Sequence, residues 1–171
     1  KELPEEKINI LFELFSSGKI DEVVAEASNL KKQYSNESLL FSICGECYIS
    51  LGIPEKALEE FIEASKIRPD VSDFYYNIGA IYSDIQEFEN AIDSYIKAIE
   101  ISPQHIKANF NLGILLYKKN LFYDAAEHFE NVLLIEQENI DALINLANTL
   151  KELGDIDTAI QKFKKILSID P

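Results

Sequence analysis

The sequence predicts an all-α protein, a right-handed solenoid in which antiparallel pairs of helices stack one after another. One observation is that small residues, alanines, aromatic residues and prolines all recur at an interval of 34 residues. Another is that each interval holds two apolar stripes with helical spacing. The recurring positions are Gly45, Gly79, Gly113 and Ala147; Ala57, Ala91, Ala125 and Ala159; Phe61, Tyr95, Phe129 and Phe163; and Pro69, Pro103 and Pro171. One period shared by several residue types indicates stacked copies of a single supersecondary unit.

Five repeats account for the chain. We place them at residues 4–37, 38–71, 72–105, 106–139 and 140–171, as a single array over residues 1–171. The first repeat departs from the pattern, because Leu11, Val23 and Ala27 stand where Gly, Ala and an aromatic residue are expected. A divergent terminal copy is typical of a cap. The last repeat has no polar helix after it, so we expect Ile160, Phe163 and Ile166 to lie at an open end.

The third repeat shows the unit most clearly. Tyr75, Ile78, Gly79 and Tyr82 have the spacing of an apolar helix stripe, and so do Phe88, Ala91, Tyr95 and Ala98. The short polar bridge from Ser83 to Glu87 predicts that these two helices, A and B, pack as an antiparallel hairpin. Pro103 ends the second helix.

Each turn from helix A to helix B calls for a residue in the left-handed conformation. Gly18, Gly52 and Gly154 supply a glycine there, and Asn120 is the next best residue. Gln86 departs from this rule, which predicts a strained or differently built turn in the third repeat.

These residues resemble the tetratricopeptide repeat, a 34-residue helix–turn–helix, over essentially the whole chain. The resemblance implies that the A helices line a concave face that binds a polypeptide. It does not extend to the clamp by which some such repeats grip a terminal carboxylate. At the positions of its cations and amide this chain has Ile8, Phe12, Ser42 and Glu46.

Asparagine recurs along the predicted concave face, two residues before the small helix-packing residue. An amide both donates and accepts hydrogen bonds, so a ladder of asparagines could hold an extended peptide by its backbone. The ladder is similar to that of O-GlcNAc transferase repeats, which implies backbone binding by Asn77, Asn111 and Asn145 and, less directly, by Asn9 and Asn148. The alternative is that these asparagines only follow the repeat consensus. Ile43 interrupts the series. Other candidates for the groove are Tyr76, Phe110, Tyr117, Lys107, Lys118 and Lys151. The three aromatic residues could form pockets for partner side chains, or they could pack against neighbouring A helices.

Charge narrows the class of partner. The chain carries 30 acidic and 16 basic side chains, a net charge of −14, and none of the five repeats is basic. This field repels nucleic acid and anionic membrane surfaces, and it favours a neutral or basic polypeptide. The alternative is that the acidic surface serves only to keep the protein dispersed.

No catalytic residues are predicted. Cys44 and Cys47 have the spacing of a redox or zinc half-site, but both are expected to be buried structural cysteines in helix A of the second repeat. His105 and His128 lie in other repeats, at a loop and on an outer helix. We therefore expect no metal, no cofactor and no enzymatic activity.

The expected function is a protein–protein interaction module that recruits a partner or substrate for a larger protein. The alternative is a scaffold that self-associates through its uncapped C-terminal repeat. The chain begins with Lys1, so we expect a segment of a longer protein. Its two cysteines do not make a disulfide framework, so the reducing cytoplasm is the expected compartment. By resemblance, a glycosyltransferase or sulfotransferase domain could follow it.

Overall fold

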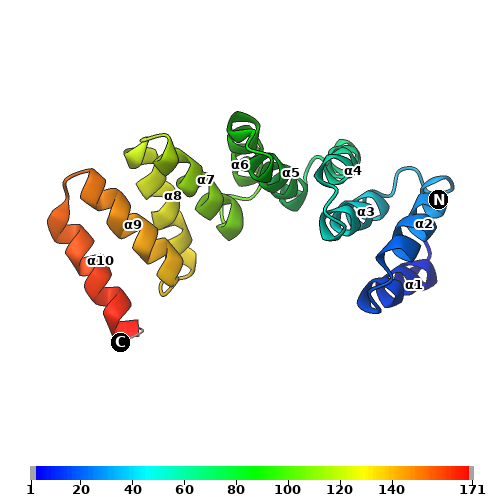
Figure 1. Ribbon diagram of the computed structural model, residues 1–171, viewed down its shortest axis with the longest axis horizontal. Coiled ribbons are helices and arrows are strands. Elements are labelled where there is room, and N and C mark those ends of the chain that lie inside the picture. Colours follow the sequence, from blue (N-terminus) through cyan, green and yellow to red (C-terminus); the bar gives the residue numbers. More distant parts are fainter. Residues whose placement is uncertain (1–2, 170–171) are drawn as a thin grey trace. The chain divides into compact units, whose positions relative to one another are not determined.

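The computed structural model describes residues 3–169, and within them the chain forms ten α-helices (Figure 1). They follow one another as helix–turn–helix pairs, and each element begins and ends as follows: α1 (Glu5–Ser16), α2 (Ile20–Lys31), α3 (Ser38–Ser50), α4 (Pro54–Ile67), α5 (Ser72–Asp84), α6 (Phe88–Ile101), α7 (Ile106–Lys118), α8 (Phe122–Ile135), α9 (Ile140–Glu152) and α10 (Ile156–Ile169). The predicted all-α architecture of sequential helix pairs is confirmed.

The helices fall into two compact units. Unit 1 comprises residues 1–91, and unit 2 comprises residues 92–171, with the boundary inside α6. In unit 1, α2 packs on both α1 and α3, and α4 packs on both α3 and α5. In unit 2, α8 packs on both α7 and α9, and α10 packs on α9.

All five turns between the helices of a pair share one geometry. A residue with φ between 62° and 83° follows each A helix, and it is Gly18, Gly52, Gln86, Asn120 or Gly154. The next residue donates its N–H to the carbonyl five positions back, as Glu87 does to Tyr82 at 2.8 Å. This pair of features is the Schellman motif, which satisfies the last carbonyls of the helix. The turn at Gln86 is therefore not built differently, and the glutamine adopts the conformation that glycine adopts elsewhere.

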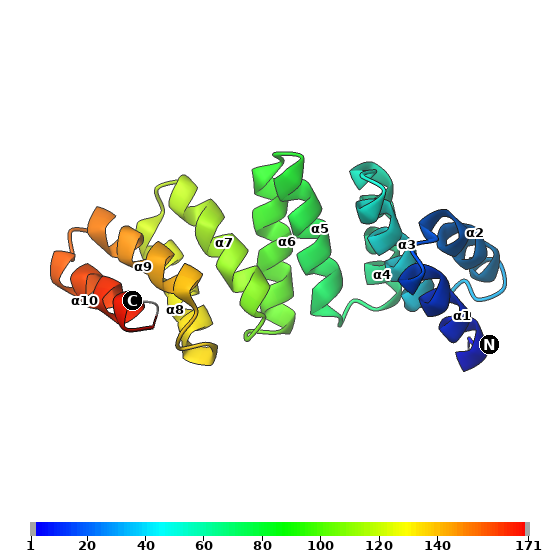
Figure 2. The ribbon, with the colours of Figure 1, turned by 60° about the horizontal axis from the view of Figure 1, so that its bottom comes forward.

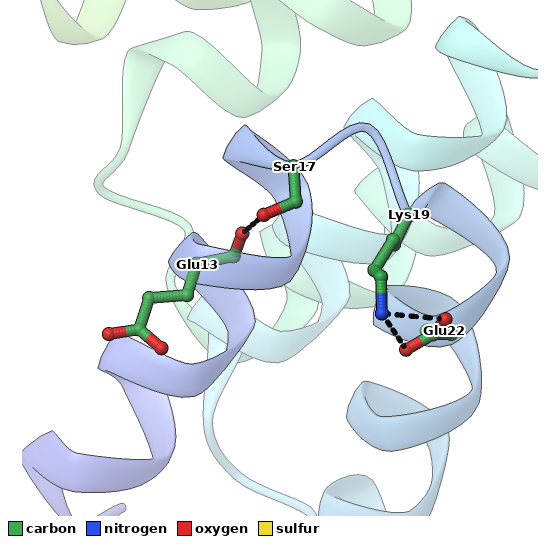
Figure 3. Close-up of polar contacts among 4 residues, drawn as sticks. All are labelled: Glu13, Ser17, Lys19 and Glu22. Carbon is green, nitrogen blue, oxygen red and sulfur yellow. Dashed lines mark hydrogen bonds and ion pairs between the residues drawn. The ribbon is translucent and has the colours of Figure 1, made fainter.

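The turn between α1 and α2 is reinforced by side chains (Figure 3). Ser17 Oγ donates to the Glu13 carbonyl at 2.7 Å, and Lys19 Nζ lies 3.2 Å from a carboxylate oxygen of Glu22. The serine bond satisfies a carbonyl at the end of α1. The ion pair is exposed on both sides, so it contributes little to stability.

The core of unit 1 follows the predicted stripes. Leu11, Val23 and Ala27 are at most 1% exposed, so the divergent first repeat packs as tightly as the others. In the second repeat the α3 and α4 helices lie side by side (Figure 2). They approach so closely that a Cβ on Gly45 would lie 2.7 Å from the ring of Phe61, which is fully buried. The small residue is required by this contact.

A nearly buried ion pair joins α2 to α4 within unit 1. Lys31 Nζ lies 2.7 Å from both carboxylate oxygens of Glu60, and the side chains are 16% and 17% exposed. The same ammonium lies 4.8 Å from the ring centroid of Phe41 on α3. These contacts tie the second helix of one repeat to both helices of the next.

Unit 2 repeats the same packing, with Gly113 of α7 against Phe129 of α8. A Cβ on Gly113 would lie 2.8 Å from that ring. Packing loosens towards the end of the chain, where Ala159 is buried but Ile160 and Phe163 are 45% and 38% exposed. The equivalent aromatic residues Phe61 and Phe129 are fully buried. Pro171 lies outside the described residues.

Candidate functional site

Three A helices of unit 1 meet around an apolar hollow of about 340 Å³, which we call the first hollow. Helix α1 contributes Leu11, Phe12 and Phe15, and α3 contributes Ile43 and Glu46. Phe12 and Phe15 are 53% and 39% exposed, although both are large and apolar. Exposed apolar groups that gather in a concavity are typical of a binding site.

A second hollow, of about 410 Å³, lies beside α5 at the turn between α3 and α4. Its lining includes Ile49, Pro54, Tyr76, Ala80 and Asp84. Asn77 lines both the first and the second hollow, so the two share a border on α5. The face of α5 that carries the predicted groove residues Tyr76 and Asn77 is therefore the face at which these concavities lie.

The charge at the two hollows is acidic. Glu46 and Asp73 line the first hollow and Asp84 lines the second, and their described linings include no Lys or Arg. Residues 1–91 carry a net charge of −10, and residues 92–171 carry −4. The acidic character of the chain is thus concentrated in the unit that holds the hollows.

The predicted asparagines of unit 1 lie at the concavities. Asn77 Nδ2 donates to Glu46 Oε1 at 3.1 Å, which links α5 to α3. This bond uses one amide hydrogen and leaves the second amide hydrogen and Oδ1 for another partner. Asn9 is exposed and lines an open depression on α1 together with Phe12 and Glu13. Ile43, which interrupts the series, forms part of the apolar wall of the first hollow.

In unit 2 the predicted asparagines lie on α7 and α9, which contact each other. Asn111 Nδ2 donates to Tyr95 Oη at 3.2 Å, and Asn145 Nδ2 donates to the Asp141 carbonyl of its own helix at 2.8 Å. Asn145 and Asn148 are half-buried. Each of the amides of Asn77, Asn111 and Asn145 therefore makes one bond within the protein and keeps one N–H and one oxygen for another partner.

The two aromatic candidates of unit 2 are half-buried and contact the B helix of their own repeat. Phe110 lies edge-on to Phe129 with ring centroids 5.9 Å apart, and Tyr117 lies edge-on to Phe122 at 5.4 Å. Such pairs stabilise helix packing. Both contacts are with α8, the B helix of the same repeat. Lys107, Lys118 and Lys151 are exposed.

A buried polar network centred on Asn109 of α7 was not predicted from the sequence. This asparagine is fully buried. Its Nδ2 donates to the carbonyls of Pro103 and His105, at 3.0 and 3.1 Å, and its Oδ1 lies 3.0 Å from His128 Nδ1. In the sequence, Asn109 occupies the core position that Tyr75 holds one repeat earlier. A polar residue at that position could have indicated the network. His105 caps α7 through Nδ1, and His128 joins α8 to α7, so both histidines serve the packing.

The cysteines are buried, as predicted. Cys44 and Cys47 are fully buried free thiols. Desolvation raises the pKa of both, to about 11 for Cys47, where Cys44 and Glu46 add to the rise. A thiol that stays protonated at neutral pH is a poor nucleophile and metal ligand. Within residues 3–169, no three His, Cys, Asp or Glu side chains come together in a way that could hold a metal ion.

In the part of the chain that the structure describes, no helix has both the length and the apolar character needed to cross a membrane.

These features define a helical repeat protein whose A helices carry concavities. Residues 72–105 match the family model of the tetratricopeptide repeat, and residues 128–161 match a second tetratricopeptide repeat model. The fold is therefore that of a tetratricopeptide repeat protein. A comparison with curated proteins found no match.

Solved structures with the same fold include a MamA protein, with a TM-score of 0.85, 23% identity and coverage of 95% of this chain and 88% of that one. MamA from Desulfovibrio magneticus RS-1, residue 41 to its end, has a TM-score of 0.83, 19% identity and coverage of 97% and 94%. YrrB, described as a tetratricopeptide repeat protein with an unusual peptide-binding site, has a TM-score of 0.81, 19% identity and coverage of 96% and 85%. The similarity is thus to MamA and YrrB proteins and not to O-GlcNAc transferase, and at these identities it concerns the fold.

Proposed function

We propose that this chain is a protein–protein interaction module that binds an extended polypeptide against its A helices. The observation that carries the proposal is the first hollow, an apolar concavity of about 340 Å³ with two exposed phenylalanines. An exposed apolar concavity costs solubility, and burial against a partner removes that cost. YrrB, which shares the fold, is described as having a peptide-binding site, and this supports the same role here.

The asparagines add binding to the peptide backbone, which does not depend on the sequence of the peptide. Asn77, Asn111 and Asn145 each retain one N–H and one oxygen after their bonds within the protein. A peptide backbone offers the complementary groups at every residue. Recruitment of a substrate or partner for a larger protein is the role that such binding would serve, without catalytic activity of this segment itself.

A neutral or basic polypeptide is the favoured partner. The acidic side chains at both hollows and the net charge of −14 attract cationic segments and repel nucleic acid and anionic lipid.

Photocrosslinking tests where a partner binds. The crosslinking amino acid p-benzoylphenylalanine replaces Phe12 in one protein and Tyr123 in another, since Tyr123 of α8 is an exposed aromatic residue of the other unit. After irradiation in a host lysate, mass spectrometry identifies the linked peptides. We expect polypeptide adducts from position 12 and few from position 123. Equal adducts from both positions, or none from position 12, would contradict the proposal.

The asparagine ladder is tested by a pull-down with wild type and the triple variant Asn77→Ala, Asn111→Ala, Asn145→Ala. Loss of many unrelated proteins from a folded variant would support backbone binding. Capture of the same proteins by both would show that the asparagines only follow the repeat consensus. Asn111→Ala alone is the control for stability, because it removes a partner of the buried Tyr95 hydroxyl.

A second candidate function is self-assembly through the C-terminal repeat. The described part of α10 exposes Ile156, Ile160, Phe163 and Leu167, at 49%, 45%, 38% and 65%. Light scattering after gel filtration tests it: oligomers that dissociate in Phe163→Glu support the scaffold, and a wild-type monomer at all concentrations excludes it.

A further inference from the structure

In unit 1, the B helix of one repeat packs on the A helix of the next through the same positions each time. The apolar cluster shared by α4 and α5 includes Leu58, Phe61, Ile62, Phe74, Ile78 and Ile81. One repeat earlier, α2 and α3 share a cluster through equivalent positions, which hold Val24, Ala27, Leu40, Cys44 and Cys47. The contact that joins one repeat to the next therefore has a fixed register.

Helix α10 exposes the residues that the other B helices cover with the next A helix. Ile160 and Phe163, at the positions of Leu58 and Phe61, are 45% and 38% exposed. Leu167 is 65% exposed, whereas Ser65 at the same position of α4 is 8% exposed. We call Ile160, Phe163, Lys164 and Leu167 the α10 face. It differs from the α4 face in charge, because Lys164 takes the place of the apolar Ile62.

Helix α1 exposes the corresponding face of an A helix. Glu6, Ile10 and Glu13, which we call the α1 face, hold three positions that are apolar and buried on α5. Ile10 is 40% exposed, whereas Ile78 at the same position is 6% exposed. The Glu13 carboxylate points away from the turn between α1 and α2 (Figure 3). The α1 face is therefore an apolar residue between two carboxylates.

The two faces complement each other in charge. Helix α1 carries three acidic side chains and one basic side chain, a net charge of −2, and α10 carries three Lys and one Asp, a net charge of +2. Within residues 3–169, Glu6, Glu13 and Lys164 take part in no ion pair. In the register of α4 on α5, the α1 face of a second copy would place Ile10 against Phe163 and Lys164 between the two carboxylates.

Other occupants of the α10 face fit less well. A second α10 would bring like charges together, which opposes association. An A helix with an ordinary apolar face would cover Lys164 without giving it a partner, and burial of an unpaired charge is costly. The α1 face offers Lys164 two carboxylates and offers the apolar residues an isoleucine.

We propose that α1 of one copy stacks on α10 of another, with Ile10 against Ile160 and Phe163 and with Lys164 between Glu6 and Glu13. The inference rests on the second candidate function, self-assembly through the C-terminal repeat, and names the surface that α10 binds. Because the two faces differ, a dimer retains one unused face of each kind, so larger species form as concentration rises. The contact of one helix face with another is small, so association is weak and reversible.

Mixing two variants tests whether the contact joins unlike faces. Ile10→Asp blocks the α1 face, and Phe163→Glu blocks the α10 face. In sedimentation velocity, each variant alone should be monomeric at concentrations where wild type associates. Their equimolar mixture should form a dimer and nothing larger, because each variant supplies one intact face. Tyr123→Glu, the same change at an exposed aromatic residue of α8, should associate as wild type does.

Charge reversal tests the register. Lys164→Glu should raise the dissociation constant about tenfold, because like charges then meet across the contact. Lys162→Glu is the matched control on the same helix. Lys162 holds the position of Glu60, whose side chain bonds to α2, so its reversal should change the constant less than about twofold. Combining Lys164→Glu with Glu6→Lys and Glu13→Lys should restore association.

The outcomes separate this inference from the functions proposed above. Association of Ile10→Asp alone, or charge reversals without effect, would overturn the inference and leave self-assembly through α10 intact. A wild-type monomer at all concentrations would overturn both and leave the peptide-binding module, which photocrosslinking tests, unaffected. Circular dichroism confirms that each variant is folded. If Ile10→Asp does not fold, the reversals at the exposed Glu6, Glu13 and Lys164 test the same contact.

Discussion

At the scale of single residues, the repeat is governed by a few positions where only one size or one backbone conformation fits. There are two kinds of such position. One is the left-handed residue after each A helix, and the other is the small residue that faces an aromatic ring. They recur because every repeat makes the same turn and the same close approach. Departures from the favoured residue at these positions therefore carry a predictable cost.

Gln86 is one such departure, with φ of 63° in a turn where three other repeats have glycine. A left-handed conformation costs a non-glycine residue about 1–2 kcal/mol, and replacement by glycine removes this cost. Part of the resulting stabilisation is offset because glycine has more conformational entropy in the unfolded chain. Gln86→Gly should therefore raise the free energy of unfolding by about 0.5–1 kcal/mol. Gln137→Gly is the matched control, since Gln137 also lies in a turn but does not have positive φ. Urea denaturation measures both, and a less stable Gln86→Gly would contradict the prediction.

Gly113 tests the close approach of α7 and α8. In an exposed helix, Ala in place of Gly stabilises by about 1 kcal/mol. Here the added Cβ would lie 2.8 Å from the buried Phe129 ring, and overpacking costs about 1–3 kcal/mol. Gly113→Ala should therefore lower stability despite the better helix propensity. In a double-mutant cycle with Phe129→Leu, the combined loss should be smaller than the sum. A stabilised single variant would show that the ring can move aside.

At the scale of elements, helices are held to one another by polar contacts that the apolar period does not reveal. In unit 2 the Asn109 amide joins the loop before α7 to His128 of α8. This histidine is half-buried, and desolvation lowers its pKa below the ordinary value of 6.5, while Glu127 and Asp124 oppose the shift.

The lowered pKa of His128 predicts a pH dependence of folding. Below pH about 6.5 the unfolded chain binds a proton at this histidine before the folded protein does, so stability falls as pH falls through this range. His128→Gln removes the titratable imidazole and keeps a polar side chain. We expect its stability to decline less than that of wild type between pH 7.5 and 5.5, as measured by thermal unfolding. Parallel curves for the two proteins would contradict the assignment.

At the scale of the whole molecule, each repeat is stabilised by its own packing and by its neighbours, so the ends differ from the interior. Helix α9 buries Leu143, Leu146 and Ala147, whereas the described part of α10 buries only Ala159.

Hydrogen exchange should follow this gradient. The amides of α10 open with a lower free energy than those of α9, because fewer apolar contacts oppose their local unfolding. We expect faster deuterium uptake in residues 156–169 than in residues 140–152, measured by mass spectrometry of peptic fragments. Equal protection of the two helices would imply that another surface covers α10, such as a second copy, and Phe163→Glu would then abolish that protection.

The sequence by itself determined the all-α class, the helix pairs, the small and aromatic packing positions and the burial of both cysteines. These follow from local spacing, because a helix stripe and a tight turn depend on residues a few positions apart. The tertiary structure alone decided where concavities form, since they arise from side chains of α1, α3 and α5 that are distant in sequence. It also showed that Ile43 belongs to an apolar wall, that Asn109 organises a buried network and that Gln86 makes the ordinary turn. Each of these depends on what a neighbouring helix presents, and no period in the sequence carries that information.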